Sequence, residues 1–146
     1  MRMVLIAIAT ALIAPSAWAQ SNAPAPGAES LDDMRTNCIS DNPDVSIAAC
    51  TADIRSGQET ANILPLAYYN RALSYFKKHL YDQAIADESE AIALNPDYFQ
   101  AYFNRGFIYE QLGKRDLALA DYSAALKISP DDADVKSALK RLGVAP

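Results

Sequence analysis

Two stretches of this chain match one another at a fixed offset of 34 residues, and this repeat constrains the fold more than any other feature of the sequence. Residues 68–96 read YYNRALSYFKKHLYDQAIADESEAIALNP, and residues 102–130 read YFNRGFIYEQLGKRDLALADYSAALKISP. The identical pairs include Tyr68/Tyr102, Asn70/Asn104, Arg71/Arg105, Tyr75/Tyr109, Ala84/Ala118, Ala91/Ala125 and Pro96/Pro130. A period of this length indicates stacked units of similar structure, each too small to bury a core alone.

Each copy contains two apolar patterns with helical spacing, separated by a turn. In the second copy the turn falls at Gly113-Lys114, and Ser129-Pro130 closes the unit. No segment alternates as a strand does with turn signals at hairpin spacing. The sequence therefore predicts an all-α chain. The expected helices cover residues 31–42, 44–57, 65–80, 81–94, 98–112, 116–128 and 131–142.

The first 19 residues have the parts of an export signal. Arg2 supplies a positive start, residues 4–14 form an apolar run, and Ala17-Trp18-Ala19 is a small-x-small cleavage site. The apolar run is too short to span a bilayer comfortably, and an uncleaved anchor is the alternative. We expect cleavage before Gln20 and an exported protein. Residues 20–29, which are rich in Pro, Gly, Ser and Ala, are expected to form a disordered leader.

The charge balance disfavours nucleic acid and membranes as partners. The formal net charge is −5, and loss of Arg2 with the signal makes it −6. A mildly acidic chain without a basic cluster lacks the electrostatic attraction that polyanions and anionic lipid surfaces require. We expect no nucleic acid partner, and no membrane association once the signal is cleaved.

Motifs for catalysis, metal binding or cofactor binding are missing from the sequence. There is no glycine-rich phosphate loop and no zinc-ligand spacing. The one histidine, His79, falls in the turn between two expected helices, where a solvated turn residue is the simpler interpretation. Asp82, Asp87, Glu88 and Glu90 are expected on the solvated side of one helix. The sequence predicts a protein that is not an enzyme and has no cofactor.

The two copies resemble the tetratricopeptide repeat, which has the same period. With Pro65 and Phe99 as first positions, the family's small, aromatic and proline positions carry the expected residue types. They are Ala72 and Gly106 at the eighth position, Tyr75 and Tyr109 at the eleventh, Ala84 and Ala118 at the twentieth, Ala91 and Ala125 at the twenty-seventh, and Pro96 and Pro130 at the thirty-second. The resemblance implies a short α-solenoid of antiparallel A and B helices, and with the short signal it favours a bacterial protein in the periplasm or outside the cell.

The two cysteines, Cys38 and Cys50, are an even count in an exported chain and indicate a disulfide. Their spacing is not that of a C-x-x-C redox motif. Sliding the period back to Leu31 places them at the eighth and twentieth positions, which lie closest in the repeats. The resemblance therefore implies a degenerate first repeat with a disulfide between its helices. Two free buried thiols are the alternative, and a thiol–disulfide enzyme is a weaker one.

This register predicts the organisation of the chain. It consists of a signal peptide (1–19), a leader (20–29), a degenerate disulfide-linked helical repeat (30–64), two clear repeats (65–98 and 99–132), and a capping helix with a short tail (133–146). A terminal element of such an array needs a polar outer side. Lys136, Lys140 and Arg141 provide it.

In this family the A helices line a concave groove, and here its positions carry aromatic and amide side chains with little charge. The expected peptide-binding residues are Tyr69, Asn70, Leu73, Phe76, Phe103, Asn104, Phe107 and Gln111. Aromatic rings can bury the apolar side chains of an extended peptide, and amides can exchange hydrogen bonds with its backbone. The alternative is that these residues only pack on neighbouring helices.

These features predict a non-catalytic module that binds a protein or peptide segment in this groove. The alternative is a structural subunit or a homo-oligomer, with the groove filled by another copy or by residues 20–28 of a neighbour. One binding mode of the family is not expected. Members that grip a C-terminal carboxylate carry Lys and Arg in successive A helices, whereas this chain has Gln100 and Asn104, or Tyr69 and Leu73, at the matching places.

Overall fold

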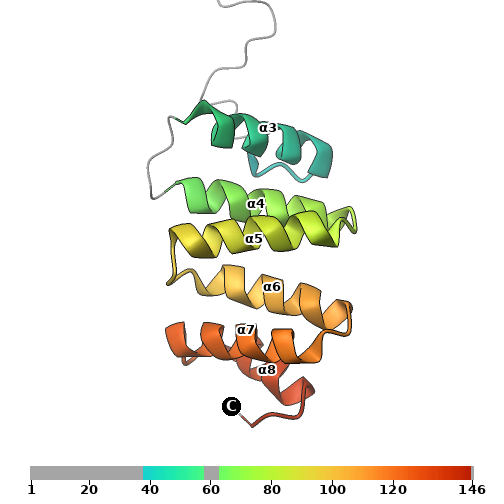
Figure 1. Cartoon of the computed structure of the whole chain (residues 1–146), viewed down its shortest axis with the longest axis vertical. Helices are drawn as coiled ribbons and strands as arrows, with labels where there is room; N and C mark the ends of the chain where they lie inside the picture. Colours follow the sequence, from blue (N-terminus) through green and yellow to red (C-terminus); the bar gives the residue numbers. More distant parts are fainter. Residues whose placement is uncertain (1–37, 58–62, 146) are drawn as a thin grey trace, which may run out of the picture.

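The computed structural model describes residues 38–57 and 63–145, which form helices stacked along one axis (Figure 1). In chain order they are α3 (Pro43–Ser56), α4 (Leu64–Lys77), α5 (Tyr81–Leu94), α6 (Phe99–Gln111), α7 (Arg115–Ile128) and α8 (Ala133–Arg141). Each helix packs on the next one in the chain. The described part of the chain contains no strand, and the all-α solenoid predicted from the sequence is confirmed.

Three of the predicted segments fall outside the described residues. They are the export signal (1–19), the leader (20–29) and the first helix of the degenerate repeat as far as residue 37. The second helix of that repeat is α3, which stacks above α4 in Figure 1. No helix within residues 38–57 and 63–145 combines the length and the apolar character needed to cross a lipid bilayer.

Capping side chains set the start of the first and last described helices. Asn42 Oδ1 accepts a hydrogen bond from the backbone N–H of Asp44 (3.0 Å), and Pro43 stands in the first turn of α3, where no intrahelical N–H is needed. At the start of α8, Asp132 Oδ1 accepts hydrogen bonds from the N–H groups of Asp134 (3.1 Å) and Val135 (2.9 Å). The sequence places the boundaries of α3 and α8 close to these positions because the caps are local signals.

The turn between α4 and α5 comes earlier than expected. The sequence places the end of the first helix near residue 80, but α4 ends at Lys77. His79 has a φ of 58°, and Gly113, which holds the same place in the next repeat, has a φ of 70°. A left-handed residue stops a helix, and His79 does so without being glycine. Its exposed imidazole lies near Tyr81, with Nδ1 and the Tyr81 hydroxyl 3.0 Å apart, so the histidine is the turn residue that the sequence predicts.

Small residues allow the two helices of each repeat to approach closely. Ala72 on α4 and Ala84 on α5 are fully buried in one cluster. On α6, a Cβ added to Gly106 would lie 2.9 Å from the Tyr122 ring of α7. The absence of a side chain at Gly106 is therefore what lets the buried tyrosine pack against α6.

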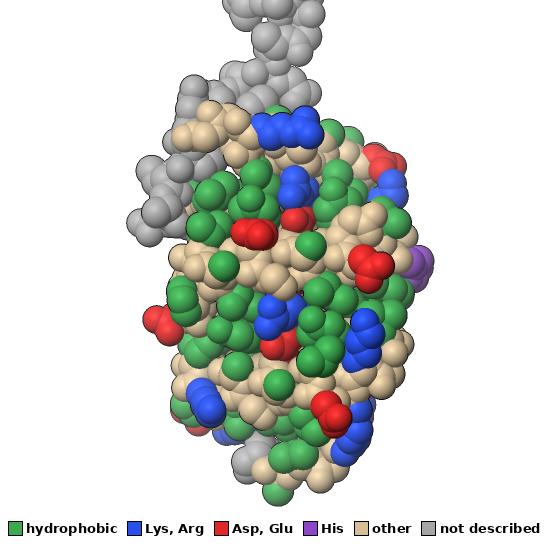
Figure 2. Space-filling view, viewed as in Figure 1, with side chains coloured by type: hydrophobic (Ala, Val, Ile, Leu, Met, Phe, Trp, Pro, Cys, Tyr) green, Lys and Arg blue, Asp and Glu red, His purple; other side chains and the backbone are tan. Residues whose placement is uncertain are grey.

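On the face drawn in Figure 2, charges of both signs are interspersed. In the space-filling view of Figure 2, basic and acidic side chains alternate with apolar ones over the helices of this face, and neither sign forms a continuous patch. Balanced charges of this kind do not attract a highly charged partner to this face.

Candidate functional site

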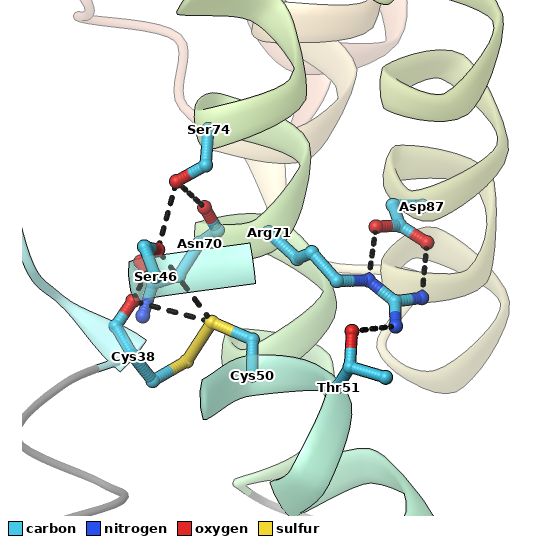
Figure 3. A network of polar contacts seen from close by, with 8 residues as sticks. All are labelled: Cys38, Ser46, Cys50, Thr51, Asn70, Arg71, Ser74 and Asp87. Carbon is cyan, nitrogen blue, oxygen red and sulfur yellow. Dashed lines mark hydrogen bonds and ion pairs between the residues drawn. A yellow bond between two sulfur atoms is a disulfide. The ribbon is translucent and has the colours of Figure 1, made fainter. Parts of the chain in front are cut away.

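An arginine on the first helix of each clear repeat connects three helices. Arg71 on α4 donates from Nε and Nη2 to the two carboxylate oxygens of Asp87 on α5, at 2.7 and 2.8 Å. Its Nη1 donates to Thr51 Oγ1 on α3 at 3.0 Å (Figure 3). The paired carboxylate raises the pKa of Arg71. Such two-pronged, charge-assisted pairs fix geometry as well as adding energy.

The same arrangement recurs one repeat later. Arg105 on α6 donates to both carboxylate oxygens of Asp121 on α7 at 2.8 Å, and to Ser89 Oγ on α5 at 2.9 Å. Asp87 is 5 % exposed and Asp121 6 %. The expectation that Asp87 lies on the solvated side of its helix is therefore wrong. An arginine from the facing helix supplies the counter-charge that a buried carboxylate needs.

A chain of hydroxyl groups connects α4 to the cysteine pair (Figure 3). Ser74 Oγ on α4 donates to Ser46 Oγ on α3 at 2.8 Å, and Ser46 Oγ donates to the Cys38 carbonyl at 2.9 Å. The sulfur atoms of Cys38 and Cys50 lie at bonding distance, with Cα atoms 4.7 Å apart. This separation is within the range that disulfides adopt. The disulfide itself stays a prediction for the protein in solution.

A cavity of about 420 Å³ lies among α4, α5, α6 and α8. Its walls are mainly apolar and aromatic, with a few polar side chains. The lining residues are Ala72, Leu73, Phe76, Glu88, Phe103, Asn104, Phe107, Ile108, Asp134, Ser137 and Arg141. Five of the groove residues expected from the sequence are among them. The rings of Phe76 and Phe107 meet edge to face, with centroids 5.7 Å apart, and connect the two A helices.

A smaller hollow of about 270 Å³ shares part of this wall. It is lined by Tyr69, Phe99, Gln100, Phe103, Asn104, Asp132 and Asp134. Tyr69 is therefore beside the cavity, and its ring lies 5.2 Å from that of Tyr98. The two remaining residues expected in the groove, Asn70 and Gln111, line neither hollow. Gln111 is exposed at the C-terminal end of α6, and the carbonyl of Asn70 lies 3.1 Å from Ser74 Oγ within α4.

Glu88 is the most unusual group in the cavity wall. Its side chain comes from α5, and the residue is only 1 % exposed. Neither carboxyl oxygen has a hydrogen-bond partner among the described residues, and Asn104 Nδ2 has none either. Burial raises the pKa of Glu88 to about 9, and the neighbouring Asn104 opposes this shift without completing a hydrogen bond of normal geometry. The expectation that Glu88 lies on the solvated side of its helix is wrong.

The only basic residue in the wall of the cavity of about 420 Å³ is already paired. Arg141 on α8 donates from Nε and Nη2 to the carboxylate of Glu110 on α6, at 2.6 and 2.8 Å. Tyr122 donates its hydroxyl to the same carboxylate at 2.7 Å. Arg141 and Tyr122 lower the pKa of Glu110. The cavity therefore presents two acids, Glu88 and Asp134, without a free cation among its lining residues.

Sequence reasoning missed Glu88, Ile108 and the α8 residues of the wall. The sequence did contain a sign that Glu88 is buried. Tyr122 lies at the matching position one repeat later, and a core position in one copy of a repeat predicts a core position in the other. The α8 residues were missed for a different reason. The sequence predicts for this helix a polar outer side formed by Lys136, Lys140 and Arg141. For Arg141 that expectation is wrong, because this residue lies with Asp134 and Ser137 on the inner side that closes the cavity.

Several similar solved structures are described as TPR domains. The Arabidopsis OM64 TPR domain shares 25% identity with a TM-score of 0.67, covering 77% of this chain and 89% of that one. The first TPR of Spaghetti (RPAP3), bound to the HSP90 peptide SRMEEVD, shares 25% identity with a TM-score of 0.67, covering 77% and 86%. The second TPR domain of human RPAP3, in complex with the HSP70 peptide SGPTIEEVD, shares 26% identity with a TM-score of 0.65, covering 77% and 90%.

No curated protein matches this sequence. The sequence pattern described as "Tetratricopeptide repeat" matches residues 67–143, which is more than half of the chain. Domains of this family are non-catalytic protein-interaction modules. The prediction that the protein is not an enzyme is thereby confirmed, and the chain belongs to the tetratricopeptide repeat family.

Proposed function

We propose that this protein binds an extended segment of a partner protein in the groove formed by α4, α6 and α8. The observation that carries the proposal is the cavity of about 420 Å³, in which three phenylalanine rings face a few polar groups. Apolar walls with a small number of placed polar groups are typical of binding sites. The adjoining hollow, which shares Phe103, Asn104 and Asp134, extends the same surface along the A helices and suits an elongated ligand.

The similar structures support a peptide as the kind of ligand, but not the same peptide. Two of the RPAP3 domains are described with bound HSP90 and HSP70 peptides whose sequences end in EEVD. The groove of the present chain places Glu88 and Asp134 in the cavity wall and offers no free basic side chain there. An acidic segment needs basic partners in its binding site, and this cavity wall supplies none that is unpaired, so a segment of a different character is proposed here.

A random peptide library displayed on phage tests the proposal. We expect the purified protein to enrich a common motif, and the Phe103→Ala variant to bind the selected peptide at least about tenfold more weakly, since one aromatic wall is lost. Leu117→Ala on α7, where the leucine is exposed and lines neither hollow, is the matched control and should bind as the wild type does. Failure to enrich any motif, or equal affinity of both variants, would contradict the proposal.

Light scattering separates this function from self-association. If the groove were filled by another copy, the purified protein would be a stable dimer and Phe103→Ala would convert it to a monomer. We expect a monomer in both cases, because the proposed occupant is a different protein.

We further propose that the partner is met outside the cytoplasm, in the bacterial periplasm or beyond the cell. The support comes from the signal-like residues 1–19 and from the pairing of Cys38 with Cys50. Disulfides persist in oxidising compartments and are rare in the cytosol.

A further inference from the structure

Burial of the Glu88 carboxyl group has a desolvation cost that no hydrogen bond within residues 38–57 and 63–145 offsets. It is 1 % exposed, and both of its carboxyl oxygens lack hydrogen-bond partners among the described residues. Buried carboxyl groups are normally paired, because an unsatisfied one loses its hydration without compensation. Two other buried acids, Asp87 on α5 and Asp121 on α7, follow this rule, since each forms an ion pair with an arginine. Glu88 is different, and its side chain forms part of the cavity wall.

The position that matches Glu88 in the second repeat is filled by a side chain whose polar group has a partner. Tyr122 stands 34 residues after Glu88. Its ring is fully buried against Gly106, and its hydroxyl is hydrogen-bonded to Glu110. Thus one copy fills the place with a satisfied aromatic side chain, whereas the other presents an unsatisfied carboxyl to an open cavity. This difference indicates that a ligand, and not the fold, completes the environment of Glu88.

The charged side chains around the cavity favour a positively charged ligand. Asp134 in its wall has no ion pair among the described residues, and Asp132 lies in the adjoining hollow. Arg141 is engaged by Glu110. The remaining acids therefore favour a cation, and the rings of Phe76, Phe103 and Phe107 suit an aliphatic stem and can add cation–π attraction.

We propose that the cavity accepts a lysine side chain of the bound segment, whose ammonium group donates hydrogen bonds to the carboxylate oxygens of Glu88. This inference rests on the proposed peptide-binding function. The four-carbon stem of lysine lies against the phenylalanine rings, and Asn104 Nδ2 donates to a carbonyl of the same segment. Lysine fits better than arginine, because a compact ammonium matches one carboxylate at the base of an apolar cavity.

Binding of this kind is coupled to loss of a proton. Burial raises the pKa of Glu88 to about 9, so the free protein holds the proton at neutral pH and the ammonium must displace it. Other ionisable side chains lie near Glu88 on the surrounding helices. Burial raises the pKa values of Tyr69 and Tyr98, and the remaining groups are carboxylates and arginines. Those groups are Asp87, Arg105, Asp121, Asp134 and Arg141.

A titration with n-butylammonium, which is the lysine side chain alone, tests the inference without any peptide. Amide shifts of the nitrogen-15-labelled protein are followed by NMR at pH 7.0, 7.75 and 8.5, with n-butanol as the neutral probe. We expect shifts at Phe103, Asn104 and Phe107, at least about tenfold tighter binding of the amine than of the alcohol at pH 8.5, and an affinity that rises about tenfold per pH unit.

Two variants complete the experiment. Glu88→Gln keeps the shape but cannot ionise, and it should bind the amine no more tightly than the alcohol at every pH. Glu90→Gln, an exposed acid on the same helix, is the matched control and should behave as the wild type.

Equal affinity for the two probes, an affinity independent of pH, unchanged amine binding by Glu88→Gln, or no shifts at all would each overturn the inference. None of these results affects whether the displayed library yields a motif. Failure of the lysine site and failure of peptide binding are therefore distinguishable. A library motif without lysine would also count against the inference while leaving the proposed function intact.

Discussion

A single side chain, Glu88, distinguishes the first clear repeat from the second. The matching residue of the second repeat, Tyr122, is buried in a position where its hydroxyl can reach Glu110. Glu88 is just as deeply buried but reaches no partner among the described residues. The difference matters for stability as well as for binding, because the folded protein holds a proton on Glu88 that the unfolded chain would release at neutral pH.

The stability of the protein should therefore fall as the pH rises. The ordinary pKa of Glu88 is 4.5 and its folded value is about 9, so between these values the folded state binds one proton more than the unfolded state. Unfolding free energy then decreases with pH, by at most about 1.4 kcal/mol per pH unit. In Glu88→Gln this dependence should be lost, so the advantage of the variant over the wild type should be large at pH 8.5 and much smaller at pH 5.5. Urea denaturation at both pH values measures it.

Glu90→Gln serves as the control for this measurement, since Glu90 is exposed on the same helix. It should follow the wild-type pH dependence. A wild-type protein that is equally stable at pH 5.5 and 8.5 would show that Glu88 is not held neutral by its surroundings.

The groove residues on the A helices were predictable because the helical period alone fixes which side chains share a face. Leu73, Phe76, Phe103 and Phe107 line the cavity for this reason. Glu88 could not be found in the same way. A charged residue on an amphipathic helix is normally solvated, and only the packing of α5 between its neighbours shows that this one is enclosed.

Two kinds of contact hold the helices of a repeat together, and they are sensitive to different substitutions. The bidentate pairs, Arg71 with Asp87 and Arg105 with Asp121, tie the helices of each repeat at the same relative position. Between α6 and α7 there is also a close steric fit, in which Gly106 receives the Tyr122 ring. The ion pairs depend on charge, whereas the steric fit depends on the absence of one methyl group.

Gly106→Ala should therefore destabilise the protein, although the same change in an ordinary helix interior stabilises by roughly 0.5–1 kcal/mol. The added Cβ would lie 2.9 Å from two atoms of the Tyr122 ring and 3.2 Å from Asp121 Cβ. Overpacking of this kind costs about 1–3 kcal/mol. Thermal or urea denaturation of the variant measures the loss.

The double variant Gly106→Ala/Tyr122→Leu provides the matching test of the cause. In the Tyr122→Leu background the alanine should cost much less, since the ring that it meets is gone. If alanine at position 106 stabilises the otherwise wild-type protein, the steric account of the α6–α7 contact is incorrect.

The stack as a whole is short, and its N-terminal end depends on contacts that cross from α3 to α4. Arg71 bonded to Thr51 and Ser74 bonded to Ser46 are two of them. A disulfide between Cys38 and Cys50 would add a covalent link of a different kind, which ties α3 to the segment before it and not to α4. Closing a loop of this length with a disulfide would stabilise the folded protein by about 3 kcal/mol, because it lowers the entropy of the unfolded chain. Short arrays bury little core and benefit most from such a constraint.

Intact-mass measurement of the protein made with residues 1–19 present tests export and the disulfide together. We expect a chain that begins at Gln20, is two hydrogens lighter than its reduced form, and shows no reactive thiol until it is reduced. Reduction should lower its unfolding free energy. A mass that retains residues 1–19 would contradict cleavage, and two thiols that react in the unreduced, unfolded protein would contradict the disulfide. Cys38→Ser/Cys50→Ser is the control, since reduction should not change its stability.

The sequence by itself determined the repeat, the helical class and the faces of the A helices, because a 34-residue period and a helical period are local properties of the chain. Tertiary structure decided which acids are buried and which are paired. Asp87 and Glu88 are adjacent in the sequence, yet one holds Arg71 and the other faces a cavity closed by α8. That outcome depends on side chains from three other helices, and their distances are set only when the repeats stack.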